Sequence, residues 1–339
     1  MLLDLAATAV AALAAFAATT SVRRNAQRLG VIQAPNARSS HTTPTPSGGG
    51  LGIVFGGTVA TAAAIAPSPW PLGIGLLIAL AIAAIGFLDD RRPLPARYRL
   101  IAQLVLVALA IGACVPLDGL AAQVGLPLPA ALVATVALIV AVYWINLFNF
   151  MDGIDGIAGS QAIFMCCGAA LLAWLHAPAI ADEAPFWMLL GVAAATFGFL
   201  LLNWPPAKIF MGDAGSTYLG FMLVFLGLVT IAAGWLSLAQ WGILAAAFAT
   251  DATVTLVRRL ALRERVFEAH RRHAYQVLSR RWGSHRTVTL AFIAINVIWL
   301  LPLAWLAALP GWAWPAAILA YLPLIGLAFY CGAGAPERA

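Results

Sequence analysis

Apolar runs long enough to cross a lipid bilayer occupy most of this sequence and limit what it can fold into. Hydrophobic residues make up 63% of the 339 residues, charged residues only 9%, and the mean hydropathy is +0.92. Helices surrounded by lipid need that much apolar surface, whereas a water-soluble domain does not. A segment in hydrocarbon must satisfy its own backbone N–H and C=O groups, so each run is expected to be helical. We therefore predict an all-α polytopic membrane protein that forms one integral-membrane domain over residues 1–339.

About eleven runs approach the ~20 residues that a membrane-spanning helix needs. They lie near residues 2–20, 48–66, 72–88, 104–116, 130–148, 157–175, 186–202, 216–233, 236–250, 288–309 and 313–331. The first run lacks a basic segment before it, so we expect a retained helix and not a cleaved signal peptide.

The basic residues predict how these helices are oriented. With the N-terminus outside, all 19 Lys and Arg residues fall in the inside loops or the C-terminal tail, and the outside segments carry acidic residues only. Because cytoplasmic loops are enriched in Lys and Arg, we expect a multi-pass protein of the bacterial inner membrane whose charged loops face the cytoplasm. The pI of about 9.5 then reflects anchors beside anionic lipid, and no nucleic-acid partner is expected.

Residues 149–156, between two of the runs, carry two carboxylates with no basic neighbour. The segment reads Asn-Phe-Met-Asp-Gly-Ile-Asp-Gly, with the carboxylates at Asp152 and Asp155. Residues three apart share a face of a helical turn, so both carboxylates are expected to converge with Asn149. Ionisable residues at membrane depth usually serve a function, and the pattern favours a site over a solvated face.

Two other inside loops carry acidic residues suited to a divalent cation. The adjacent carboxylates of Asp89 and Asp90 repel each other, and either a cation or the neighbouring Arg91 and Arg92 would relieve that repulsion. Asp213 lies in the segment Phe-Met-Gly-Asp-Ala-Gly-Ser, where the glycines present it on exposed backbone like a metal ligand.

Further residues in the inside loops are suited to phosphates and a base. Lys208 offers a point charge for phosphate, and Phe210 is either a membrane anchor or a platform on which a base stacks. The loop around Thr45 ends in three glycines, at 48–50, whose N–H groups either converge on an anion or allow tight helix packing.

The inside segment 251–286 holds nine Arg residues. Their positive electrostatic potential is suited to a polyphosphate, although many such residues serve as membrane anchors. It includes the run His270, Arg271, Arg272 and His273. Zinc binding there is not expected, because the two histidines have no nearby cysteine or third ligand.

Together these segments resemble the polyprenyl-phosphate N-acetylhexosamine-1-phosphate transferases, the glycosyltransferase 4 family. The matching segments are 35–41 with 44–46, the pair at 89–90, 149–156, 210–216, Asp251 with Arg258 and Arg259, and 270–273, in family order over about residues 35–276. The His-Arg-Arg-His run looks most like the WbpL branch, which starts lipopolysaccharide O-antigen units, since MraY-type members usually have consecutive histidines there. Some relatives extend the acid pair to Asp-Asp-x-x-Asp, but Pro93 stands at the fifth position here, so only the pair is carried over.

The resemblance implies transfer of an N-acetylated amino-sugar 1-phosphate from a UDP-sugar to undecaprenyl phosphate, with UMP released and Mg²⁺, or alternatively Mn²⁺, as cofactor. It implies metal binding by Asp213 and Asp152, uridine contacts from Asn149, Asp155 and Phe210, and diphosphate contacts from His270 and His273. Asp89, Asp90 and Asp152 would arrange the metal and the lipid phosphate. We also expect Thr45, Lys208, Arg271 and Arg272 to bind substrate.

Several alternatives stay open at this point. A peptidoglycan-type phospho-MurNAc-pentapeptide transferase is the nearest one, and an intramembrane prenyltransferase or an anion transporter is less favoured. Transporters place ionisable residues near mid-membrane, whereas the carboxylates here lie at the inner ends of the runs. The identity of the sugar, direct transfer against a covalent aspartyl-phosphate intermediate, and a homodimer against other oligomeric states also stay open.

Overall fold

The computed structural model describes residues 2–33, 44–67, 70–124, 128–264 and 270–336. Its first half contains α1 (Leu2–Arg24), α2 (Ala26–Leu29), β1 (Ile32–Gln33), β2 (Thr45–Pro46), α3 (Gly50–Ile65), α4 (Leu72–Arg91), α5 (Ala96–Cys114), α6 (Leu117–Val124) and α7 (Ala130–Phe150). Its second half contains α8 (Ile157–His176), η1 (Pro178–Asp182), α9 (Ala184–Asn203), α10 (Asp213–Ala232), α11 (Leu238–Ala261), α12 (Ala274–Trp282), α13 (His285–Ala294), η2 (Ile295–Leu300), α14 (Leu301–Leu306) and α15 (Ala313–Cys331). The whole of the predicted segment 35–41 lies outside the described residues.

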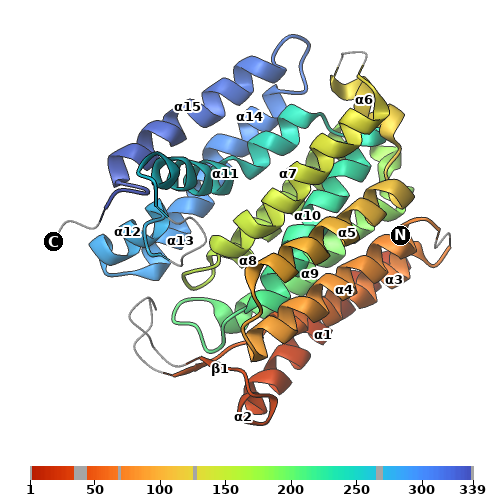
Figure 1. Cartoon of the computed structure of the whole chain (residues 1–339). Helices are drawn as coiled ribbons and strands as arrows, with labels where there is room; N and C mark the ends of the chain where they lie inside the picture. Colours follow the sequence, from red (N-terminus) through yellow and green to blue (C-terminus); the bar gives the residue numbers. More distant parts are fainter. Residues whose placement is uncertain (1, 34–43, 68–69, 125–127, 265–269, 337–339) are drawn as a thin grey trace.

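The helices confirm the predicted all-α polytopic fold. In the described ranges, ten helices are long and apolar enough to cross a membrane, and α3 is a shorter apolar helix. Each of the eleven predicted runs corresponds to one of these helices, with α13, η2 and α14 forming a single span, His285–Leu306. The helices run side by side as one bundle, and the two chain ends lie at opposite ends of it (Figure 1).

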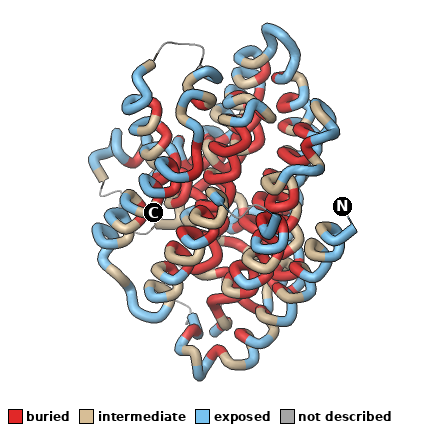
Figure 2. Tube along the Cα trace, turned by 90° about the vertical axis from the view of Figure 1, so that its right-hand side faces the viewer, coloured by how far each residue is buried: buried red, intermediate tan, exposed pale blue. Residues whose placement is uncertain are grey.

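Helix α10 is the centre of the bundle. In its most apolar stretch 94% of the residues are buried, and it packs against α3, α4, α7 and α9. Figure 2 shows the buried positions gathered inside the bundle and the exposed ones on its outer helices. Many exposed side chains are large and apolar, such as Leu77, Ile298 and Tyr330, which is the surface that a lipid environment favours.

The segments that lead into α3 and α10 are joined by backbone hydrogen bonds. Strands β1 and β2 pair antiparallel, and the carbonyl of Pro46 in β2 accepts a 2.9 Å hydrogen bond from the N–H of Phe210. The N–H groups of Gly49 and Gly50 donate to the carbonyls of Phe210 and Met211, both at 2.8 Å, and Thr19 on α1 donates its hydroxyl to the carbonyl of Gly49 at 3.2 Å.

The glycine run at 48–50 thus serves packing at two of its three positions. The N–H groups of Gly49 and Gly50 are already paired with backbone carbonyls. A Cβ on Gly50 would lie 2.3 Å from the Cα of Gly215, so α3 and α10 approach each other more closely than any side chain allows. The sequence left two interpretations of this run, anion binding by its N–H groups or close helix packing. For Gly49 and Gly50 the contacts support close packing.

Candidate active site

The carboxylate of Asp90, on α4, caps the N-terminus of α10. Its two oxygens accept hydrogen bonds from the backbone N–H groups of Asp213, at 2.7 Å, and Ala214, at 3.1 Å. The first N–H groups of a helix have no partner within that helix, and a carboxylate is favoured beside them. The tight approach needs Gly212, whose φ of +76° is unfavourable for other residues and whose added Cβ would lie 2.7 Å from the Asp90 carboxylate.

Arg99, in the first turns of α5, bridges two of the predicted site carboxylates. Its Nη1 forms an ion pair with Asp89 and a second one, at 3.0 Å, with Oδ2 of Asp213. The Asp89 carboxylate also accepts a 2.6 Å hydrogen bond from the N–H of Leu94. The counter-charge of Asp89 is therefore Arg99 and not Arg91 or Arg92, which are exposed.

Sequence reasoning treated Arg99 as one of many positive-inside anchors and missed this role. The available signal was its place in the first turns of the helix after the acid pair, where it faces the ends of α4 and α10. A small polar cavity beside it is lined by Gln103, Asn146, Asn149 and Asp213, among others, which marks the same spot from the structure.

Asn149, near the end of α7, completes the cluster around Asp213. Its Nδ2 donates to Oδ1 of Asp213 at 2.9 Å and to Oγ of Ser216 at 2.7 Å. The structure thus brings Asp89, Asp90, Asn149 and Asp213 together from the ends of three helices, α4, α7 and α10.

Asp152 and Asp155 do not share a helical face, contrary to the prediction. Helix α7 ends at Phe150, and residues 151–156 form a turn in which Gly156 has a φ of +75°. Burial raises the pKa of Asp152 well above its usual range, and the nearby negative charges of Asp213 and Asp90 raise it further. Asp152 therefore lies close to the Asp213 cluster.

The contacts of Asp155 are with other loops, which it ties together. Its Oδ2 accepts a 3.0 Å hydrogen bond from the N–H of Ala207, in the loop before α10, and its Oδ1 lies 3.2 Å from Nδ1 of His285 on α13. The hydroxyl of Thr289, one turn further along α13, donates to the Asp155 carbonyl at 2.9 Å. His285 was not among the predicted site residues, because nothing in the sequence places α13 beside this turn.

His273 is buried at the start of α12, beside a second carboxylate cap. Asp251 on α11 accepts hydrogen bonds from the N–H groups of Ala274, at 2.8 Å, and Tyr275, at 2.9 Å, and its Oδ1 lies 3.3 Å from Nδ1 of His273. The hydroxyl of Tyr275 donates to the carbonyl of Phe150 at 3.0 Å, so α12 contacts the turn that carries Asp152.

Arg272 and His270 belong to a third cluster, around Glu264. Two nitrogens of Arg272 hold the Glu264 carboxylate, and Nε of the buried Arg259 donates to it at 3.1 Å. These contacts lower the pKa of Glu264 to about 2, with the Arg272 hydrogen bonds as the largest cause. Burial lowers the pKa of His270 to about 3, and the charges of His273, Arg259 and Arg272 lower it further.

The remaining predicted residues lie around these clusters at the same end of the bundle. Thr45 is buried in β2, and Phe210 is half-buried in the loop joined to it. Lys208 is exposed in that loop, and Arg271 is half-buried next to the Arg272 cluster.

The donor set around Asp213 suits a hard divalent cation. In the described part of the chain, no three His, Cys, Asp or Glu side chains are grouped closely enough to form a complete protein cage for a metal. Mg²⁺ does not need one, because it is usually held by one or two carboxylates together with water and substrate phosphates. The negative charge of Asp213 helps to raise the pKa of Asp152, so the two carboxylates lie near enough to interact.

Fold and site together define a polytopic membrane protein with an acid-rich polar site at one end of its helices. The sequence profile of Glycosyl transferase family 4 matches residues 72–231. The chain is 31% identical to the decaprenyl-phosphate N-acetylglucosaminephosphotransferase of Mycobacterium tuberculosis, over 93% of this chain and 87% of the relative. It is 26% identical to a probable undecaprenyl-phosphate N-acetylglucosaminyl 1-phosphate transferase of Bacillus subtilis, over 83% of this chain and 78% of the relative.

A shorter match links the chain to a third kind of enzyme. It is 36% identical to the phospho-N-acetylmuramoyl-pentapeptide-transferase of Chlamydia muridarum, over 26% of each protein. The chain belongs to glycosyltransferase family 4, the polyprenyl-phosphate N-acetylhexosamine-1-phosphate transferases.

Proposed function

We propose that this protein transfers an N-acetylated amino-sugar 1-phosphate from a UDP-sugar to undecaprenyl phosphate, and so starts an O-antigen or related cell-surface glycan at the cytoplasmic side of a bacterial inner membrane. The observation that carries the proposal is the cluster of Asp89, Asp90, Asn149 and Asp213, held together at one end of an apolar bundle. A site at the bilayer edge is open both to a water-soluble donor and to an acceptor with a long lipid tail. The relatives named above act on polyprenyl phosphates, which agrees with this placement.

The reaction joins two anionic partners. An oxygen of the lipid phosphate attacks the sugar-bearing phosphorus of the donor, and the bond from that phosphorus to the bridging oxygen breaks, so that UMP leaves. The second pKa of a phosphate monoester lies near ~6, so the acceptor is already largely dianionic at neutral pH and needs no strong general base. Charge neutralisation and positioning are the main tasks of the site.

We propose that these tasks are divided among particular residues. Asp213 and Asp152 would hold Mg²⁺, which, when bound, neutralises charge on the phosphates. Both carboxylate oxygens of Asp90 accept hydrogen bonds from the backbone of α10, so its role is to position Asp213 and not to touch substrate. Arg99 keeps the carboxylates of Asp89 and Asp213 in place and supplies positive charge beside them.

The loops around the cluster would hold the donor. In this proposal Phe210 and Asn149 contact uridine, while Lys208, Arg271 and His270 contact phosphates. Asp155 and His273, which are engaged with His285 and Asp251, would act by fixing the loops that carry these contacts. The His-Arg-Arg-His run, in place of consecutive histidines, favours this reaction over transfer of phospho-MurNAc-pentapeptide.

The test is release of UMP by purified protein given undecaprenyl phosphate and a panel of UDP-amino sugars, with and without EDTA. We expect release that depends on both substrates, stops with EDTA and returns with Mg²⁺. Asp213→Asn should abolish release, whereas Asp182→Asn, an exposed acid in η1 at the other end of the bundle, should not change it. Release of diphosphate from a prenyl donor, or solute uptake into sealed vesicles without UMP formation, would contradict the proposal.

A further inference from the structure

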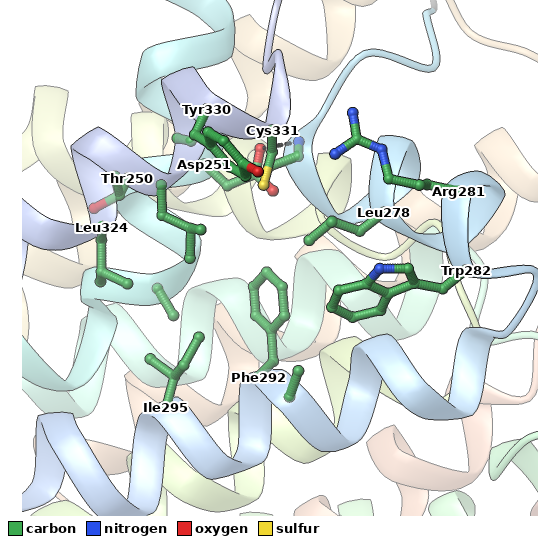
Figure 3. Close-up of a pocket in the computed structure, with 15 residues that line it drawn as sticks. Thr250, Asp251, Leu278, Arg281, Trp282, Phe292, Ile295, Leu324, Tyr330 and Cys331 are labelled. Atoms are coloured by element: carbon green, nitrogen blue, oxygen red, sulfur yellow. Dashed lines mark hydrogen bonds between the residues drawn. The ribbon is translucent and has the colours of Figure 1, made fainter.

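A cavity of about 430 Å³ lies between α11, α12, α15 and the α13–η2 segment, at the end of the bundle where the basic residues gather. Figure 3 shows Leu278, Phe292, Ile295 and Leu324 around it. Its volume falls in the range of about 300–1,000 Å³ that holds small ligands. Its mainly apolar wall fits a hydrocarbon chain.

The rim of this cavity carries residue types that favour the headgroup layer of a membrane. Arg281 and Trp282 lie on one side of it, and Tyr330 lies on the other (Figure 3). All three side chains belong to exposed residues, so the rim faces the surroundings of the bundle. Trp and Tyr favour the membrane interface, and a basic residue beside them attracts anionic lipid.

Helix α12 has the pattern of a helix that lies in the interface. One face carries the buried residues Tyr275, Gln276 and Ser279, and its last turn carries Arg280 and Arg281. Amphipathic helices with basic residues and a Trp rest at the boundary between headgroups and acyl chains. Arg281 and Trp282, both exposed, are the residue types that such helices present to lipid.

The one acidic residue among those that line the cavity does not oppose an anionic ligand. Asp251 is 3% exposed, and its carboxylate accepts hydrogen bonds from the N–H groups of Ala274 and Tyr275. Arg281, in contrast, has no hydrogen bond or ion pair with another residue in the described ranges. The accessible charge at the cavity is therefore positive.

We propose that this cavity binds an anionic phospholipid of the surrounding bilayer, with an acyl chain in the apolar part and the phosphate on Arg281. The occupant is distinct from the acceptor of the transfer reaction. The acceptor's phosphate must reach Asp213, and none of the elements that line the cavity carries Asp89, Asp90, Asn149 or Asp213.

Native mass spectrometry of the purified full chain in mild detergent tests this proposal without measuring activity. Phosphatidylglycerol and phosphatidylcholine with the same acyl chains are added at equal concentrations. We expect one phosphatidylglycerol to be retained in preference to phosphatidylcholine. Arg281→Gln should weaken that retention about five-fold, since one basic residue beside an anionic surface contributes ~1 kcal/mol. Arg281→Lys should keep most of it, because only the charge is needed.

Matched variants separate the cavity from the general membrane surface. Arg24→Gln removes an exposed charge at the same end of the bundle, and Ala108→Trp adds bulk on an exposed position of α5; neither should change retention. Ala291→Trp adds the same bulk inside the cavity and should displace the lipid, with unchanged retention by Ala108→Trp as its reference. If Ala291→Trp does not fold, the Arg281 variants decide alone.

Three results would overturn the proposal. The first is equal retention of the two phospholipids by the unchanged protein. The second is a loss on Arg24→Gln as large as that on Arg281→Gln. The third is stoichiometric displacement of phosphatidylglycerol from the unchanged protein by undecaprenyl phosphate, because that result would make the cavity the seat of the acceptor.

Discussion

Asp90 and Asp213 are joined by a 2.7 Å hydrogen bond from the Asp213 backbone to the Asp90 carboxylate, although 123 residues separate them in sequence. With the second bond, from Ala214, the carboxylate holds the first turn of α10 against the end of α4. Because Asp213 lies on that turn, its side chain is positioned from α4.

Asp90→Asn is expected to act through this positioning. An amide can accept only one of the two backbone bonds well, and a lost cap is worth ~1 kcal/mol of stability, so the melting temperature should fall slightly. UMP release should fall at least about tenfold, one decade for each 1.4 kcal/mol, with weaker apparent affinity for Mg²⁺ or donor. Asp118→Asn, an exposed acid at the other end, is the control. Normal affinities with lost chemistry and a shifted pH–rate profile would argue instead for direct proton transfer.

Arg99→Gln is expected to slow transfer more than any other single loss of positive charge on α4 or α5. It leaves Asp89 and Asp213 without their shared partner. A charge-assisted hydrogen bond contributes about 2 kcal/mol, so the rate should fall roughly 30-fold. Arg92→Gln removes an exposed charge from the same loop and should have little effect. Equal losses of transfer rate in the two variants would mean that only the overall positive potential of this region matters, and not the contacts of Arg99.

Asp155 and His285 should be energetically coupled. They lie 3.2 Å apart and are both largely buried, so Asp155→Asn and His285→Ala should each lower the melting temperature. The double variant should lose less than the sum of the two, with a coupling of about 0.5–3 kcal/mol. Strict additivity would show that the pair does not fasten α13 to the 151–156 turn.

Stability should decline as the pH falls below about 6.5, with His270 as one cause. The unfolded chain protonates this histidine near its usual pKa of 6.5, whereas the folded protein does so only at a pKa of about 3. The unfolded state thus binds more protons in that window, so acid favours unfolding. Burial is the largest cause of this lowered pKa; the charges of His273, Arg259 and Arg272 lower it further, and that of Glu264 raises it. Between pH 7.5 and 5.5 the melting temperature should change less with pH for His270→Gln than for His176→Gln. Equal changes in the two variants would contradict the role of His270.

Gly50→Ala should destabilise the protein, although alanine favours helices. Its Cβ would meet the Cα of Gly215 at 2.3 Å, and forcing a methyl group into a packed core costs about 1–3 kcal/mol. Gly73→Ala, on α4, meets only Ile65 at 3.8 Å and should be neutral or slightly stabilising. Thermal melting of the two variants in one detergent provides the comparison.

The fold could be predicted because lipid imposes one rule on every span. A run near 20 residues without charge must be a helix, and each of the eleven runs is one. Orientation relative to the cell stays a prediction, since it depends on the basic residues alone.

The site could be predicted as a set of residues but not as a set of contacts. Asp89, Asp90, Asn149 and Asp213 come together as expected. The convergence of Asp155 with Asn149 was wrong, because Phe150 ends α7 and the chain turns. Arg99 and His285 were missed because their partners come from other helices, and sequence spacing carries no information about such contacts.

The hydroxyl of Thr19 donates a hydrogen bond to the carbonyl of Gly49, and the N–H of Gly49 donates to the carbonyl of Phe210. Helix α1, at the periphery of the bundle, is thus connected to a loop of the candidate active site. Helix α1 packs along α3 and α9, yet only 17% of the residues in its apolar stretch are buried, so bilayer thickness acts directly on a helix that contacts Gly49. Turnover in thin and thick membranes should therefore differ even where the substrates are the same.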